Sequence, residues 1–268
     1  MKFVNEFIGY SPDVRFEYFS GSDSIDVFND NLKTQPDDWY YKNTTITYER
    51  NSNGHRCKEI NDIDLDNYIL FAGCSHTEGI GLELEKTYPY ILSKKLKMDY
   101  YNLSLGATGT DTLFYNLVQW KVNIRQKPKL LVIQWPNRAR YLKMLANDFV
   151  HPLATGHIGK DEQDLREIGI WNALDDEQRF LVLGDSPTTN YFHSKKVLFG
   201  RMIHSLYNYT KIIKLNHGTL DEPEKTADFE WDKTVHIDYA RDLRHGGIET
   251  NNNVAEKINQ YLSSVQYS

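Results

Sequence analysis

The sequence has little of what several protein classes require. Only two cysteines, Cys57 and Cys74, occur in 268 residues, which excludes a disulfide framework and a cysteine-rich zinc site. No window approaches the 18 uncharged apolar residues of a membrane-spanning helix, so no membrane partner is expected. The segment Met1–Phe7 is interrupted by Asn5 and Glu6 and lacks the apolar stretch of a secretory signal. We therefore expect a cytoplasmic protein, and a viral origin is compatible with this.

Negative charge exceeds positive charge. The chain has 31 Lys and Arg against 37 Asp and Glu, a net charge of −6, which gives no overall attraction to nucleic acid. Glycine-rich phosphate loops and His-x-x-x-His pairs are absent, so we expect no cofactor, no metal and no nucleic-acid partner. With 40% hydrophobic residues, the chain is too apolar for a disordered protein and long enough for one large α/β domain.

The chain divides into two parts. Residues 1–66 are rich in aromatic side chains and lack helical periodicity. The β-prone segment Thr44–Tyr48 and the turn signal Asn51–Gly54 favour a short hairpin there. We interpret residues 1–66 as an N-terminal extension that packs on a main domain of residues 67–268.

The main domain alternates strand and helix patterns. Four buried strands are predicted, at Tyr68–Ala72, Asp99–Leu103, Leu130–Ile133 and Lys211–Leu215. Helical stripes lie between or after them, formed by Ile91, Leu92 and Leu96; by Leu113, Leu117, Trp120 and Ile124; by Leu198, Phe199, Met202, Ile203 and Leu206; and by Val254, Ile258 and Leu262. This alternation predicts a parallel sheet with helices on both faces. The polar stretch from about 142 to 195 is interpreted as an insertion beside the carboxyl edge of the sheet.

Ligands of parallel sheets bind at the carboxyl ends of the strands, so the residues there carry the chemistry. Ser75 follows the first strand and is a candidate nucleophile, although a serine hydroxyl requires a base. His245 can be that base, and Asp242 can orient its ring from three residues away. These three side chains form a predicted catalytic triad for acyl transfer.

A tetrahedral oxyanion needs hydrogen-bond donors. The predicted donors are the backbone N–H of Ser75, the backbone N–H of Gly106 and the side-chain amide of Asn137, which follows the third strand. The register of the glycine loop also leaves Gly109 open as the backbone donor.

The order of these blocks resembles that of the SGNH, or GDSL-like, hydrolase family. Gly73–Thr77 resembles its Gly-Asp-Ser-x-Thr block, Asn102–Gly109 its glycine block, Asn137 the Asn of its Gly-x-Asn-Asp block, and Asp242–His245 its Asp-x-x-His block. Tyr48–Arg56 is similar to a segment that precedes the first strand in some members. The resemblance covers roughly residues 45 to 263.

Two departures from the family pattern stand out. Cys74 replaces the usual Asp and is interpreted as a buried small residue, and Trp135 replaces a Gly and should reshape the substrate cleft. We expect Trp135, Arg138 and His76 to contact the substrate, since rings and hydrogen-bond donors suit a sugar. Asn137 and Arg138 follow that tryptophan after Pro136.

The resemblance implies a three-layer α/β/α, flavodoxin-like fold and a serine esterase. We expect it to hydrolyse a short acyl ester, acetyl first, carried by a small molecule or a carbohydrate. Two alternatives remain open at this point. One is an O-acyltransferase that uses the same site with a sugar hydroxyl in place of water, and the other is a catalytically silent carbohydrate-binding module.

A second serine, Ser186, lies in a sequence that also matches the nucleophile block. Gly184–Thr188 reads Gly-Asp-Ser-Pro-Thr and matches the first block literally at Ser186. However, the remaining blocks do not follow it in order, so we assign Ser186 to a helix end or a loop.

Overall fold

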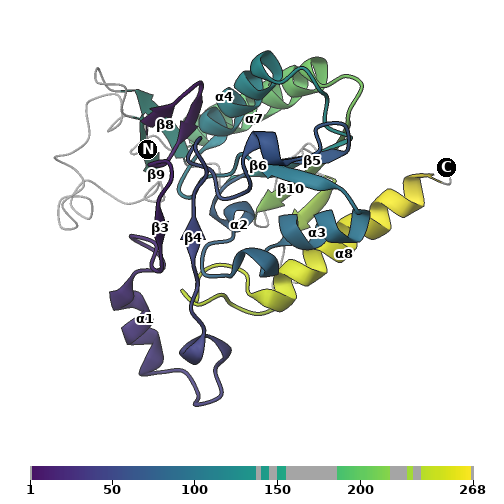
Figure 1. Ribbon diagram of the computed structural model, residues 1–268. Coiled ribbons are helices and arrows are strands. Elements are labelled where there is room, and N and C mark those ends of the chain that lie inside the picture. Colours follow the sequence, from purple (N-terminus) through teal and green to yellow (C-terminus); the bar gives the residue numbers. More distant parts are fainter. Residues whose placement is uncertain are drawn as a thin grey trace.

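A parallel sheet forms the centre of the molecule. The computed structural model describes residues 2–136, 140–144, 150–154, 186–217, 228–231 and 237–266. The sheet strands are β5 (Tyr68–Ala72), β6 (Asp99–Asn102), β7 (Leu130–Trp135), β10 (Lys211–His217) and β11 (Phe229–Trp231). Their spatial order is β11-β10-β7-β5-β6, and all neighbours run parallel. Counted along the chain this is the 2-1-3-4-5 order of flavodoxin-like folds, which confirms the predicted fold class (Figure 1).

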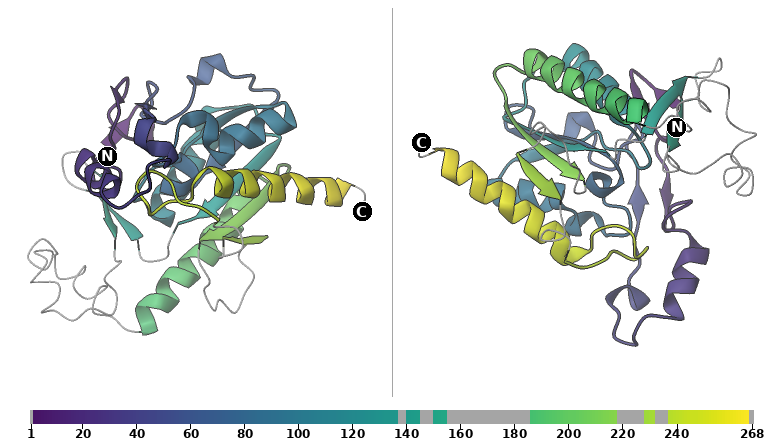
Figure 2. Two further views of the ribbon diagram at one scale, coloured as in Figure 1. Left: turned by 90° about the horizontal axis from the view of Figure 1, so that it is seen from below. Right: turned by 180° about the vertical axis from the view of Figure 1, so that it is seen from behind.

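Helices cover both faces of this sheet. α4 (Thr110–Asn123) and α7 (Ser186–Leu206) lie on one face, and α3 (Tyr88–Leu96) and α8 (Ile248–Gln266) lie on the other (Figures 1 and 2). Every residue of β5 and β7 is buried, because both faces of these central strands are covered.

Side chains alternate between the two layers along each strand, as the pleat requires. Leu70 and Leu131 pack with Leu117 and Trp120 of α4, whereas their neighbours on the same strands face α3 and α8. The second core contains Ile69, Phe71, Val132, Leu92, Val254 and Ile258. The predicted helical faces of α3, α4 and α8 therefore pack inward as expected.

The stripe of α7 differs from its prediction. Phe199 and Ile203 pack against the core, but Leu198 and Met202 are 55% and 42% exposed. Two apolar stripes one residue apart compete on this helix, and the one containing the ring of Phe199, which stacks on Phe114 with centroids 4.4 Å apart, is buried.

The N-terminal extension is built of short elements. A hairpin joins β1 (Lys2–Val4) to β2 (Phe7–Gly9), and β3 (Arg15–Phe16) pairs with β4 (Tyr48–Glu49). β4 thus pairs with an earlier strand rather than with one after the predicted turn. α1 (Ile25–Leu32) was not predicted: its eight residues carry only a short apolar stripe of Ile25, Phe28 and Leu32, and none of them is buried.

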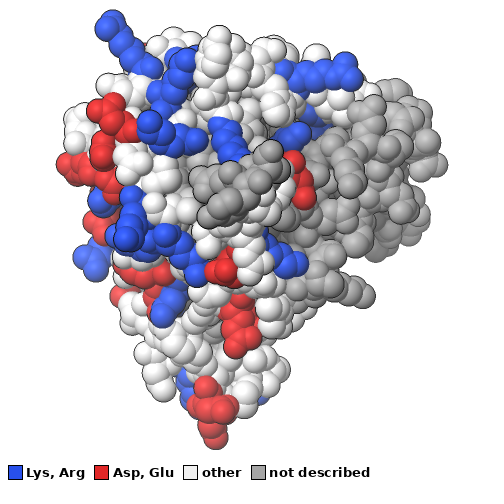
Figure 3. Space-filling model, turned by 90° about the vertical axis from the view of Figure 1, so that its right-hand side faces the viewer, with Lys and Arg blue, Asp and Glu red and all other residues white. Residues whose placement is uncertain are grey.

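The remaining described elements are peripheral. Short 3-10 helices occur at Tyr40–Asn43, Ile60–Asp62 and Leu84–Lys86, and β8 (Arg140–Met144) pairs with β9 (Val150–Ala154) within the predicted insertion. Among the described residues, no helix has the length and apolarity needed to cross a membrane. Figure 3 shows one face of the surface, on which basic and acidic side chains are interspersed.

A buried polar loop joins the extension to the main domain. His55 is fully buried, and its Nδ1 lies 3.1 Å from the hydroxyl of Tyr101 on β6. Asn51 accepts the backbone N–H of His55 and donates to the same hydroxyl at 3.1 Å. Burial, and then the nearby charge of Arg50, lower the pKa of His55 from 6.5 to about 3.

This shift predicts an acid-sensitive fold. Between pH 6.5 and about 3 the unfolded chain binds a proton at residue 55 that the folded chain does not, so stability falls as the pH is lowered. The expected slope is about 1.4 kcal/mol per pH unit in that window. Urea unfolding of the wild type and of His55→Gln at pH 7.5, 5.5 and 4.5 measures it. We expect the variant to lose much less stability on acidification; equal losses in both proteins would refute the assignment.

Candidate active site

Ser75 lies at the turn between the central strand β5 and the short helix α2 (Ser75–Glu78). Cys74 ends the extended segment, with φ −119° and ψ −153°, and Ser75 begins the helix. The turn is tight: a Cβ added to Gly73 would lie 2.3 Å from Thr77 Oγ1, so only glycine fits there. This turn places Ser75, which is 7% exposed, at the carboxyl edge of the sheet.

The structure brings the three predicted triad residues together. His245 Nε2 lies 2.7 Å from Ser75 Oγ, and its Nδ1 lies 2.5 Å from Asp242 Oδ2. The Ser75 and His245 side chains come from segments 170 residues apart. A proton on Nδ1 bonds the carboxylate and leaves Nε2 as an acceptor for the serine proton.

Asp242 also shapes the turn that carries His245. Its Oδ1 accepts the backbone N–H groups of Arg244 at 3.1 Å and His245 at 3.0 Å. Leu243 has a left-handed φ of 54° between them, a conformation that costs a non-glycine residue energy and that the two bonds offset. One carboxylate therefore fixes the backbone of the turn through one oxygen and the imidazole ring through the other.

A second contact holds this turn against the nucleophile segment. Arg241 donates its backbone N–H to the carbonyl of Gly81 at 3.1 Å. Gly81 has φ +82°, and a Cβ there would lie 2.8 Å from Ala240 Cβ. Only glycine allows this close approach. The contact holds the segment after α2 beside the segment that precedes His245.

A buried ion pair connects the N-terminal extension to the turn that carries His245. The Asp23 carboxylate accepts hydrogen bonds from Nε and Nη2 of Arg241, at 2.9 and 2.7 Å, and the pair is therefore bidentate. Asn31 of α1 donates to the carbonyl of Arg241 at 2.9 Å. Sequence analysis missed this pair, since its partners are 218 residues apart and follow no local spacing.

The glycine loop after β6 requires a correction. The Gly106 N–H, predicted to bind the oxyanion, donates at 2.5 Å to the Glu78 carboxylate and is therefore occupied. The next residue, Ala107, is exposed and has a left-handed φ of 61°. Among the described residues, the backbone N–H of Ala107 and that of Gly109, which precedes α4, form no backbone hydrogen bond. The left-handed conformation of Ala107, which marks this loop as a candidate site, could be seen only in the structure.

The remaining residues singled out in the sequence lie in different places. The ring of His76 lies 4.7 Å from that of His245, centroid to centroid, so it flanks the triad. Trp135 is 1% exposed and belongs to the core, which corrects the expectation that its ring lines the cleft. Asn137 and Arg138 lie outside the described residues. Ser186 is the first residue of α7.

The cysteines are placed as structural residues. Cys74 is 2% exposed. Burial raises the pKa of the Cys57 thiol to about 12, so it is protonated near neutral pH and is a poor nucleophile. No group of three or more metal-ligating side chains gathers within the described part of the chain.

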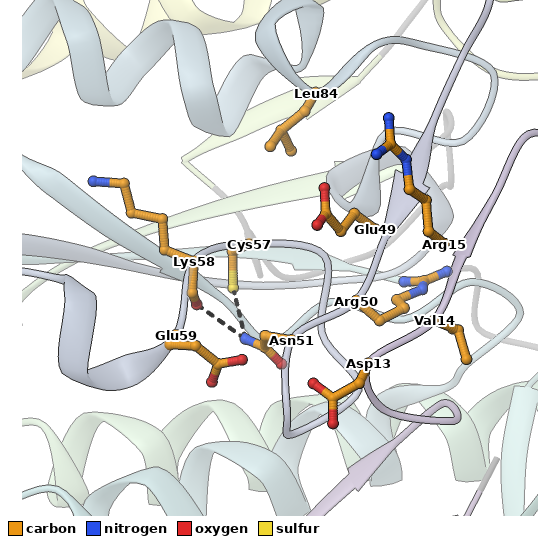
Figure 4. A pocket seen from close by; sticks show the side chains of 10 residues that line it. All are labelled: Asp13, Val14, Arg15, Glu49, Arg50, Asn51, Cys57, Lys58, Glu59 and Leu84. Atoms are coloured by element: carbon orange, nitrogen blue, oxygen red, sulfur yellow. Dashed lines mark hydrogen bonds between the residues drawn. The ribbon is translucent and has the colours of Figure 1, made fainter.

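A cavity of about 450 Å³ lies in the extension, with Leu84 as its only lining residue from the main domain (Figure 4). It is lined by Asp13, Val14, Arg15, Glu49, Arg50, Asn51, Cys57, Lys58, Glu59 and Leu84. No triad residue lines this cavity, so it is distinct from the catalytic candidates.

Comparison with known proteins gives distant structural similarity only. No protein-family model matches the chain, and no curated protein matches it by sequence. Solved structures similar to it include a carbohydrate esterase with divergent catalytic and non-catalytic binding functions, with a TM-score of 0.46, 13% identity, and coverage of 74% of this chain and 65% of that one. An acetyl xylan esterase from the rumen bacterium Butyrivibrio proteoclasticus has a TM-score of 0.46 and 12% identity, over 75% of this chain and 64% of that one.

A third similar structure is a member of the lipolytic protein G-D-S-L family from Veillonella parvula. Its TM-score is 0.31 and its identity 11%, over 74% of each chain. The present chain spans about 65% of the length of the two carbohydrate esterases.

Proposed function

We propose that this protein is a serine ester hydrolase in which Ser75 is the nucleophile, His245 the general base and Asp242 the residue that orients the base. The observation that carries the proposal is the continuous relay from Ser75 Oγ to His245 Nε2 and from His245 Nδ1 to Asp242 Oδ2. An N-terminal cap would explain a lone serine, but it would not explain an imidazole and a carboxylate aligned behind it.

The relay supports a two-step reaction. Ser75 Oγ attacks the ester carbonyl as its proton passes to His245 Nε2, and the tetrahedral intermediate collapses as that proton passes to the departing alcohol. Water then attacks the acyl-serine, its proton moves to His245, and the same proton returns to Ser75 as the acid leaves. The oxyanion of each intermediate is bound by the N–H groups of Ser75 and Ala107, together with the Asn137 amide that the sequence motif supplies.

The acyl group that fits this site is short. Ser75 is only 7% exposed, and its neighbours in the site are polar, among them His76 and His245. A long acyl chain would need an extended apolar surface beside the nucleophile. The imidazole of His76 beside the triad makes this part of the site polar, which suits a polar alcohol, so we propose acetyl as the acyl group and a sugar hydroxyl as the alcohol.

Chain-length selectivity tests this assignment. We expect kcat/KM on an aryl acetate to exceed that on the octanoate by about tenfold or more, because added methylenes have no apolar surface to occupy. Acetyl, butyryl and octanoyl aryl esters are compared first, and acetate release from acetylated oligosaccharides second. Preference for octanoate without acetate release from any acetylated sugar would contradict the substrate proposal.

Hydrolysis and transfer share the acyl-enzyme and differ in the acceptor. Hydrolysis is the simpler assignment because Ser75 and His245 retain some exposure, which gives water access. Product analysis with added oligosaccharide separates them: free acid as the main product supports the hydrolase, whereas an acylated oligosaccharide would identify an acyltransferase.

A further inference from the structure

The segment Tyr48–Arg56 has no role in the reaction described above, yet it contains two buried arginines. Arg56 is 1% exposed and donates to the carbonyls of Gly79 and Leu82 at 2.6 and 2.7 Å. Arg50 is 2% exposed and forms an ion pair with Glu78, both side chains being fully buried. Both arginines thus hold the segment that begins at the nucleophile.

Glu78 connects this pair to the oxyanion loop. One carboxylate oxygen pairs with Arg50 Nη1, and the other accepts the Gly106 N–H at 2.5 Å. Burying two charges is costly, and a packed apolar pair could replace them at little cost in stability. A buried pair with its second oxygen on a loop backbone therefore suggests a positional rather than a stabilising role.

Tyr10 contacts both the Gly106 carbonyl and Arg50. Its hydroxyl donates to the carbonyl of Gly106 at 3.0 Å, and its ring lies under the Arg50 guanidinium, 4.4 Å from centroid to Cζ. Both polar backbone groups of Gly106 are therefore held. The Gly106 carbonyl and the Ala107 N–H belong to one planar peptide and point in opposite directions. Fixing the carbonyl on Tyr10 fixes the direction of the Ala107 N–H.

We propose that Tyr10, Arg50 and Glu78 are positioning residues that orient the Gly106–Ala107 peptide for oxyanion binding. The N-terminal extension is then part of the catalytic apparatus, since it contributes two of the three side chains. This inference rests on the proposed function. It assigns a role to the extension that the triad alone does not require.

The decisive comparison uses two double variants. Arg50→Met with Glu78→Gln removes both charges and keeps a side-chain oxygen for the Gly106 N–H, whereas Arg50→Met with Glu78→Leu removes both charges and the acceptor. Each protein is titrated to its end point with a fluorophosphonate, so that kcat on an aryl acetate is expressed per reactive site. The KM, the pH profile and the melting temperature are measured alongside.

Because the Gln double variant keeps an acceptor for the Gly106 N–H, we expect it to retain about tenfold more kcat per site than the Leu double variant, which should lose about 10- to 100-fold relative to the wild type, less than direct removal of an oxyanion donor. KM and the apparent pKa of the rate profile should stay unchanged, because the triad is untouched. Equal kcat per site in the two double variants would overturn the proposal, even if both melt at lower temperature or contain fewer reactive sites.

Tyr10→Phe gives an independent test with a matched control. It removes the hydroxyl and keeps the ring, and we expect kcat per site to fall about three- to tenfold. Tyr207→Phe removes another buried hydroxyl that donates to a carbonyl, that of Leu117 at 2.7 Å, on the α4 and α7 side of the sheet. The control should lose thermal stability without losing kcat per site. Equal kcat losses in both variants would assign Tyr10 a merely structural role. Failure of the proposed function itself is distinguishable, because the wild type would then show neither titration nor turnover.

Discussion

Replacing Ser75 by Ala should reduce ester hydrolysis by about 10⁴- to 10⁶-fold while the protein stays folded. The hydroxyl is the only group lost, and its hydrogen-bond partner is the imidazole of His245, so the core is unaffected. Steady-state hydrolysis of an aryl acetate gives the activity, and urea unfolding gives the stability of the same preparation.

Ser186→Ala is the matched control for that experiment. Ser186 has the literal family signature around it in sequence, but it begins α7 instead of following a central strand. We expect near wild-type turnover. Loss of activity in Ser186→Ala with retention in Ser75→Ala would place the nucleophile elsewhere.

Replacing Asp242 by Asn should lower kcat by about 10⁴-fold. The Asn oxygen can still accept the backbone N–H groups of Arg244 and His245, so the turn is kept. The amide NH₂, however, then faces His245 Nδ1 in place of Oδ2 and donates to it. This forces the ring proton onto Nε2, where it blocks acceptance of the serine proton.

Asp238→Asn provides the comparison for this substitution. Asp238 caps the start of α8, where its two oxygens accept the backbone N–H groups of Thr250 at 2.8 Å and Glu249 at 3.1 Å. It has only a capping role, so kcat should change by less than about threefold. A loss below tenfold in Asp242→Asn would show that Asp242 merely caps its turn.

The parts of the fold that local patterns encode were predictable from the sequence. β5 and β7 are continuous apolar runs because they are buried on both faces, and the stripe of α4 reads directly as one helix face. Parallel order then places the ends of these strands at one edge, so Ser75 and His245 could be paired although 170 residues separate them.

Other features depend on packing between distant segments and leave no local pattern. The pairs of Asp23 with Arg241 and of Arg50 with Glu78 join residues 218 and 28 apart, separations too long for the period of one helix or strand to reveal. β11 has only three residues, too few to show a period. Trp135 packs in the core with Ile203 of α7, a helix that is distant from it in the sequence.

The backbone of the oxyanion loop was also beyond sequence analysis. Gly106 and Gly109 both suit a loop that approaches a substrate, and the choice of donor depends on which N–H groups are already bonded. Glu78 occupies that of Gly106, a contact that only the folded arrangement of α2 against the loop determines. Ala107 adopts a left-handed φ of 61°, a conformation that the presence of an alanine does not predict from sequence.

Covalent labelling with a fluorophosphonate, followed by intact mass and peptide mapping, tests the central claim most directly. The account predicts one adduct per chain, on the peptide that contains Ser75, with hydrolysis lost in proportion to labelling. The adduct should be absent in Ser75→Ala and form far more slowly in His245→Ala. Ester hydrolysis that persists with Ser75 unlabelled, or an adduct on another serine that abolishes activity, would contradict it.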